Sequence, residues 1–119
     1  MMWPTLKSQS HFDEVYSRGR RQVCAALVLI HLESAPDTRV AFVASRKIGG
    51  AVQRNRAKRL MREAFRQVET SASMPPGWLV MIARRDILRL KSVEVAERLR
   101  GLLAAGRAVG NASQVRPLA

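Results

Sequence analysis

The sequence is poor in the residues that make disulfides, metal sites and acid–base catalytic centres. Its 119 residues include one cysteine, Cys24, and two histidines. One cysteine excludes an intrachain disulfide and a multi-cysteine metal site, and its apolar neighbours predict a buried, unreactive thiol. Two histidines provide little material for a nuclease centre of the acid–base type.

Long apolar runs and leader sequences are also missing. No apolar stretch approaches the ~18 residues that a membrane-spanning helix requires. The first residues do not form a basic-then-apolar leader with a small-residue cleavage site. We therefore expect the protein to act in the cytoplasm. Its length fits one domain, and a hydrophobic content of 47% is sufficient for a compact core.

Acidic residues are few relative to basic ones. Nine Asp and Glu oppose 21 Lys and Arg, which gives a net charge of +12. Such an excess repels itself in a compact chain unless an anion neutralises it, and the candidate anions are nucleic acid and a membrane surface. Arginine supplies 17 of the 21 basic residues. Because the guanidinium group fits phosphate oxygens and stacks on bases, this composition favours nucleic acid.

The hydrophobic pattern predicts one α+β domain with the element order α-β-β-α-β-α. Apolar residues at helical spacing predict a first helix over residues 8–17, which Gly19 would end. An almost continuous apolar run predicts a strand over residues 22–32, and a second run predicts another over residues 39–45. A turn at Pro36 would join these two strands as an antiparallel hairpin.

The second half of the chain continues this α+β pattern. We expect a helix over residues 51–68, a short strand over residues 78–83 and a last helix that begins near Ser92. These elements would form a small mixed sheet with helices packed on it. The domain is predicted over residues 1–104, and the small, aperiodic residues 105–119 are predicted to form a disordered tail.

The helix predicted over residues 51–68 has two contrasting sides. On a helical wheel, its apolar side chains gather on one side, and its basic residues gather with Asn55 on the other. Between Arg54 and Arg66, six basic residues and one acid give a net charge of +5. A solvated helix usually mixes acids with bases, because like charges four residues apart are destabilising. We therefore interpret this side as a surface for a polyanion, with affinity that falls steeply with salt. The residues on this side are Arg54, Asn55, Lys58, Arg59, Arg62 and Arg66. We also expect contacts from Arg56 of the same helix and from Arg46 and Lys47 just upstream.

A longer pattern surrounds this basic helix. Residues 45–63 read S-R-K-I-G-G-A-V-Q-R-N-R-A-K-R-L-M-R-E. This segment closely resembles the signature of the bacterial ribonuclease P protein family, in which Ser-basic-basic, Gly and Ala-Val precede Arg-Asn-Arg, Lys-Arg and Arg-Glu. The family's upstream F-x-x-V-(aromatic)-x-x-G is matched at Phe12, Val15, Tyr16 and Gly19. The resemblance covers most of the chain, over residues 6–103.

The resemblance implies the small protein partner of a catalytic RNA. The complex hydrolyses a phosphodiester of precursor tRNA, which releases the 5′ leader and leaves the mature 5′ end. The catalytic centre would belong to the RNA with its bound Mg²⁺, so no catalytic residue and no metal site is expected in the protein. One protein per RNA is expected. The resemblance also implies a left-handed β-α-β crossover through the basic helix, against a rule that ~98% of such connections obey.

The resemblance further divides the RNA contacts between two surfaces. The basic helix and the loop before it would face the catalytic RNA. A cleft between the first helix and the sheet would take the single-stranded leader, with Phe12 and Tyr16 stacking on its bases. Placement of both aromatic residues in the core is the alternative. Where the family commonly has an aromatic residue on the first strand, the register from Gly19 gives Ile30, so apolar contact would replace stacking.

Two other functions fit parts of the sequence. A protein-only nuclease could use His11 and His31 as an acid–base pair, or Asp13 and Glu14 as Mg²⁺ ligands. Adjacent helical residues face apart, however, and we prefer a first-turn role in which the two carboxylates complement the helix dipole. A ribosomal or other structural RNA-binding protein fits the charge and size equally well, and only the signature over residues 45–63 argues against it.

Overall fold

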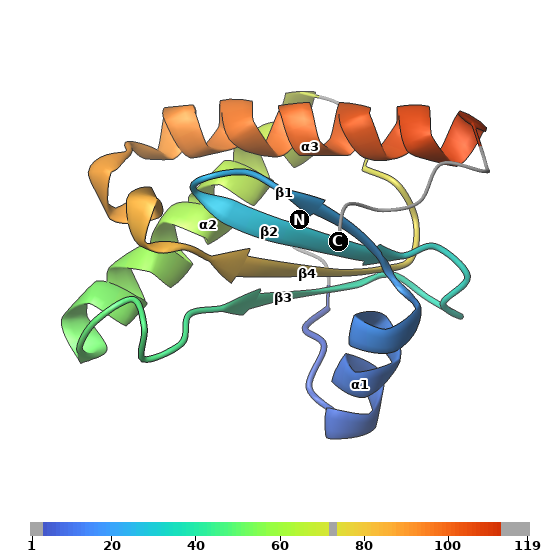
Figure 1. Ribbon diagram of the computed structural model, residues 1–119, viewed down its shortest axis with the longest axis horizontal. Coiled ribbons are helices and arrows are strands. Elements are labelled where there is room, and N and C mark those ends of the chain that lie inside the picture. Colours follow the sequence, from blue (N-terminus) through green and yellow to red (C-terminus); the bar gives the residue numbers. More distant parts are fainter. Residues whose placement is uncertain (1–3, 72–73, 113–119) are drawn as a thin grey trace.

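The computed structural model describes residues 4–71 and 74–112, with side chains up to residue 106 (Figure 1). The elements along the chain are α1 (Gln9–Arg18), β1 (Arg20–Val23), β2 (Leu27–Leu32), β3 (Arg39–Val43), α2 (Ala51–Ser71), β4 (Trp78–Ala83), the 3₁₀ helix η1 (Arg85–Arg89) and α3 (Ser92–Ala112). The predicted α+β class is confirmed.

The four strands form one mixed sheet in the order β1-β2-β4-β3. β1 and β4 each pair antiparallel with β2, whereas β3 pairs parallel with β4. Parallel neighbours require a crossover connection, and here α2 provides it between β3 and β4. This β3–α2–β4 unit is the crossover to which the resemblance assigns a left hand.

Two predictions about the strands are wrong. The apolar run over residues 22–32 is not one strand, because the chain reverses after β1 in a turn closed by a hydrogen bond from Cys24 N to Leu27 O (3.0 Å). Cys24 is therefore half-buried at this turn rather than buried within a strand. β2 and β3 do not form a hairpin either, because β4 lies between them. A continuous apolar run does not indicate where the chain reverses direction, and it does not indicate the order of the strands across the sheet.

The helices cover the two faces of the sheet unequally. α2 and α3 lie over one face (Figure 1), where Leu29, Met81, Phe65 and Leu99 belong to the larger core cluster. α1 lies over the other face and covers only part of it, with Val15 in a smaller cluster. The uncovered part of this second face is a candidate for binding, because its apolar side chains remain partly exposed.

The ends of α1 and α3 differ from the predicted ends. α1 starts after Ser8 and stops at Arg18, with Gly19 as its C-cap as expected. α3 continues to Ala112, beyond the point where a disordered tail was predicted to begin. Arg20 Nη1 donates to the carbonyl of Gly106 on this extension (3.3 Å). The remainder of the predicted tail, residues 113–119, lies outside the described residues, and the domain boundary at residue 104 stays a prediction.

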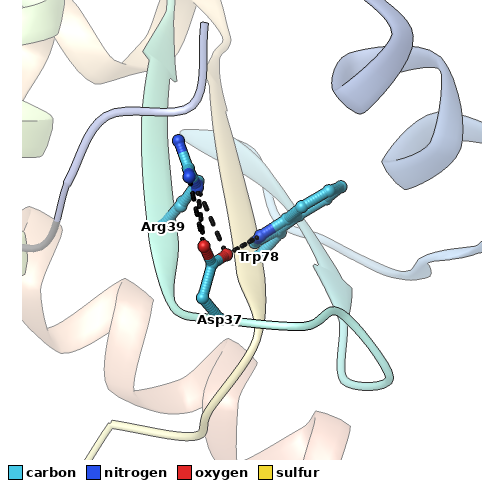
Figure 2. A network of polar contacts seen from close by, with 3 residues as sticks. All are labelled: Asp37, Arg39 and Trp78. Carbon is cyan, nitrogen blue, oxygen red and sulfur yellow. Dashed lines mark hydrogen bonds and ion pairs between the residues drawn. The ribbon is translucent and has the colours of Figure 1, made fainter. Parts of the chain in front are cut away.

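A polar network fixes the loop between β2 and β3 to the neighbouring strand (Figure 2). Asp37 accepts two hydrogen bonds from Arg39 Nε, both at 3.2 Å, and one from Arg39 Nη2 at 3.1 Å. Trp78 Nε1 on β4 donates to the same carboxylate at 2.6 Å. These hydrogen bonds from Arg39 and Trp78 hold the pKa of Asp37 below its ordinary value. The loop is thereby tied to the strand that follows α2.

Candidate nucleic-acid interface

The loop between β3 and α2 is folded so that its basic residues point outward. Ser45 Oγ accepts a hydrogen bond from Lys47 N (3.3 Å), and the Ser45 carbonyl accepts one from Ile48 N (3.0 Å). Ile48 is buried and anchors the loop, whereas Arg46 and Lys47 are exposed. Gly49 has a φ of +143°, a conformation that favours glycine. Its role is therefore to allow the turn that leads into α2.

α2 separates its apolar and basic residues as the wheel predicts. Its buried residues are Ala57, Leu60, Met61, Ala64, Phe65 and Val68, which is the predicted apolar side. The predicted basic side is accessible: Arg54 and Lys58 are partly exposed, and the exposed residues are Asn55, Arg56, Arg59, Arg62 and Arg66. The wheel works because burial against the sheet follows the helical repeat.

The cations of α2 form no ion pair with any side chain that the structure describes. Across the described residues, the ion pairs are Arg18 with Glu14 and Arg39 with Asp37, and neither lies on α2. Arg54 Nη1 donates to the Gly49 carbonyl (3.2 Å), which orients the guanidinium beside the loop. Glu63 relieves only part of the repulsion on the basic side of α2, because no described carboxylate forms an ion pair there, and an external anion would relieve the remainder.

Arg62 is held differently from the other cations of this row. Its guanidinium carbon lies 5.8 Å from the centroid of the Phe42 ring, which is cation–π distance. Phe42 in turn packs edge-on against Phe65, with the two ring centroids 5.9 Å apart. The contact with Phe42 therefore orients the Arg62 side chain towards β3, and its charge remains available at the surface.

The uncovered part of the second sheet face carries a row of apolar side chains. Val23 pairs with Val28, Val28 with Ile82, and Ile82 with Val43, so one residue from each strand lies in a single line across the sheet. All four are partly exposed. We call these four residues the apolar row. Such a row offers contact to flat apolar groups but carries no charge of its own.

Phe12 and Tyr16 stand beside this part of the sheet on α1. Phe12 is half-buried, Tyr16 is 40% exposed, and their ring centroids lie 6.1 Å apart. Burial of part of the Tyr16 ring raises the pKa of its hydroxyl, and the positive charge of Arg21 opposes the shift. Phe12 therefore belongs partly to the core, whereas Tyr16 keeps an accessible ring.

Ile30 does not line a cleft, which corrects the prediction made for it. Its side chain is fully buried in the same cluster as Val15. A Cβ placed on Gly19 would come within 2.7 Å of Ile30 Cγ2, so the end of α1 presses directly on this residue. Val28, two residues earlier, points to the same face and lies beyond the helix. The alternation along β2 could have suggested Val28, but only the position of α1 decides between the two.

A basic hollow of about 630 Å³ adjoins the apolar row at the end of β4. Its lining includes Ile82 from the row, Lys47 from the loop before α2, and the charged side chains of Arg84, Arg85 and Asp86. Arg84 and Arg85 are not among the residues that the sequence predicted for RNA binding. An Arg-Arg pair placed directly after an apolar strand was the available signal.

The two histidines do not form a catalytic pair. His11 packs against the Trp78 ring, with centroids 4.5 Å apart. His31 Nε2 donates to the carbonyl of Pro76 (2.6 Å). Each ring therefore has its own structural environment, on α1 and on β2 respectively.

The two carboxylates of α1 are also used locally. Asp13 accepts a hydrogen bond from Gln9 Nε2 (2.9 Å), and Glu14 pairs with Arg18. Neither lies in the first turn of α1, so the predicted interaction with the helix dipole is wrong. Within residues 4–71 and 74–112, no three His, Cys, Asp or Glu side chains gather as a metal-ligand set. No described helix is long and apolar enough to span a membrane.

Comparisons with known proteins agree with this geometry. The model of the family described as Ribonuclease P matches residues 4–106. The ribonuclease P protein component of Nitratiruptor sp. is 40% identical over 84 residues, covering 71% of this chain and 74% of that protein. That of Symbiobacterium thermophilum is 37% identical over 100 residues, covering 82% and 85%. The solved RNase P protein from Thermotoga maritima is 27% identical with a TM-score of 0.70, covering 83% of this chain and 94% of that chain.

The fold and the site define a class of small basic α+β proteins in which a parallel β3–α2–β4 crossover presents a cationic helix. Within that class, the chain belongs to the family of ribonuclease P protein components. The alternative of a ribosomal protein is not favoured, because the family match spans nearly the whole described chain.

Proposed function

We propose that this protein binds the catalytic RNA of ribonuclease P through α2 and the loop before it. The observation that carries the proposal is the basic side of α2, which has no ion-pair partner among the described residues. Phosphate contacts position RNA without reading its sequence, because every nucleotide presents the same phosphate. The contacts would come from Arg46 and Lys47 in the loop and from the basic side of α2.

The 5′ leader of precursor tRNA would bind across the other face of the sheet. The apolar row provides flat apolar contact, and Tyr16 and Phe12 provide rings on which unpaired bases can stack. The hollow at the end of the row adds the cations Lys47, Arg84 and Arg85, which suit the leader's phosphates. This combination of stacking and charge accepts any leader sequence, as a processing enzyme with many substrates requires.

The chemistry would belong to the RNA. Mg²⁺ bound mainly by the RNA would supply the metal assistance for hydrolysis of the phosphodiester. In the described chain, carboxylates and histidines do not gather as a ligand set, so the protein's own residues do not fit the role of holding that ion. The protein would contribute by neutralising phosphates where two RNAs meet, which lowers the Mg²⁺ concentration needed for assembly. We place this activity in the cytoplasm, with one protein per catalytic RNA.

Reconstitution tests the proposal directly. Precursor tRNA is incubated at low Mg²⁺ with the protein alone, with the catalytic RNA alone, and with both. We expect cleavage only, or much faster cleavage, when both are present, and products ending at the mature 5′ terminus. Cleavage by the protein alone would indicate a protein nuclease instead. An unchanged rate on adding the protein to the RNA would contradict the proposal.

A further inference from the structure

Val52 is an unusual residue on α2. It is 78% exposed, the highest value among the exposed large hydrophobic side chains of the described chain. At about 100° per residue, Val52 lies about 20° from Arg59 and about 40° from Arg56 around the helix. It therefore stands among the cations that we propose to contact RNA, on the side away from the buried residues.

The fold gives no reason for valine at this position. With this exposure, Val52 does not fill the core, and it takes no part in either core cluster. A β-branched side chain is also less favourable in an exposed helix than alanine, lysine or arginine. An apolar group that neither packs in the core nor favours its own helix is available for a contact outside the chain, and the charges around it decide which contact that is.

The charges around Val52 select the partner. A second copy of this chain would bring another cationic helix against Arg56 and Arg59, and the two surfaces would repel each other. RNA offers both groups that the surface needs, because its phosphates lie beside riboses and base faces that present C–H groups. On the protein, the apolar side chain of Val52 beside the guanidinium groups of Arg56 and Arg59 is complementary to this arrangement of C–H groups and phosphates.

We propose that Val52 makes a dry apolar contact with a ribose or base of the catalytic RNA, within the α2 interface. The inference rests on the proposed function, because it assumes that this side of α2 meets that RNA. Phosphate contacts position the RNA but do not distinguish one nucleotide from the next, since every phosphate is alike. Val52 adds a contact to a group other than a phosphate, and it is therefore a positioning residue that helps to fix the register of α2 on the RNA.

The test compares Val52→Thr with Val93→Thr. Val93 is also the second residue of its helix and is 54% exposed, but it lies on α3, away from the basic side of α2. Threonine keeps the branched shape and adds a hydroxyl. We expect Val52→Thr to raise the Kd for transcribed ribonuclease P RNA about fivefold to tenfold. The factor should be the same at every salt concentration, because no charge is lost. Val93→Thr should bind within about twofold of the wild type.

A third variant separates failure of this inference from failure of the proposed function. Arg59→Gln should lower the slope of log Kd against log salt by about one, the value for one lost phosphate contact. If Arg59→Gln changes neither Kd nor slope, α2 does not face the RNA and the proposed function fails with it. If Arg59→Gln behaves as expected but Val52→Thr binds like Val93→Thr, only the role of Val52 is overturned. Thermal melts check each fold, and Val52→Ala replaces Val52→Thr if the latter melts early.

Discussion

Reversal of two charges at the start of α2 is the most demanding test of the proposed RNA interface. The perturbation is Arg54→Glu combined with Arg56→Glu. Arg56 is exposed, and Arg54 is partly exposed beside the loop. The matched control reverses Arg98 and Arg100, two exposed arginines on α3 that lie outside both proposed surfaces.

The expected loss follows from the exposure of these groups. A charge pair about 4 Å apart contributes about 1 kcal/mol in a fully solvated setting, and more where the partner excludes water. Reversal replaces an attraction by an equal repulsion, so each site costs about 2 kcal/mol and the pair about 4 kcal/mol. That corresponds to a Kd about a thousandfold higher. The slope of log Kd against log salt should fall by about two, one for each lost phosphate contact.

The fold should tolerate the double reversal. Arg54 and Lys58 are four residues apart, so Arg54→Glu converts a repulsive pair into an attractive one. We therefore expect thermal melts close to those of the wild type. The assay is a titration of the catalytic RNA with each variant at several salt concentrations. A double variant that binds like the α3 control, while retaining its fold, would refute the assignment of α2 to the RNA.

Three further predictions concern the leader, the Asp37 network and the sheet. Phe12→Ala should raise KM about fivefold or more for precursor tRNA with a long leader, because a stacked base contributes ~1–3 kcal/mol. KM for a substrate with one leader nucleotide should not change, and equal effects on both substrates would assign Phe12 to the core alone. The hydrogen bond from Arg39, and then that from Trp78, lowers the pKa of Asp37 below its ordinary value of 3.8. The contribution of Asp37 to the free energy of unfolding is therefore fully present above pH 3.8 and is lost as the pH falls through the folded-state pKa. Asp37→Asn should flatten the acid limb of a pH–stability curve, and an unchanged limb would contradict this cause. Gly77→Ala should lower the free energy of unfolding by about 1 to 3 kcal/mol, because φ is +109° and a Cβ would lie 2.3 Å from a carbonyl oxygen of β2; denaturant unfolding with no change would disprove the strain.

The two proposed surfaces meet at one end of the molecule. Lys47 belongs to the loop that enters α2 and also lines the hollow at the end of the apolar row. An RNA on α2 and a single strand on the sheet would therefore approach each other near this residue. The arrangement suits a protein that holds a substrate's leader against a catalytic RNA, because phosphate repulsion is greatest where the two chains come together.

The sequence by itself determined the basic helix and the family to which the chain belongs. The side chains of α2 divide into buried and exposed sets as the wheel predicts, from Ala57 to Val68 on one side and from Arg54 to Arg66 on the other. This prediction succeeds because the helical repeat is a local property of the backbone, and one apolar stripe is enough to orient the helix. The signature over residues 45–63 likewise lies in one continuous segment, which the family match includes.

The surface proposed for the leader was decided only by the tertiary structure. Ile30 and Val28 point to the same face of β2, and nothing in their own segment says that α1 buries the first and leaves the second accessible. The apolar row takes one residue from each of four strands, and its line depends on β4 lying between β2 and β3. Arg84 and Arg85 join Lys47 only because β3 and β4 run parallel and end side by side. Strand order and helix placement are fixed by contacts between residues far apart in the chain, and the periodicity of one segment carries no information about them.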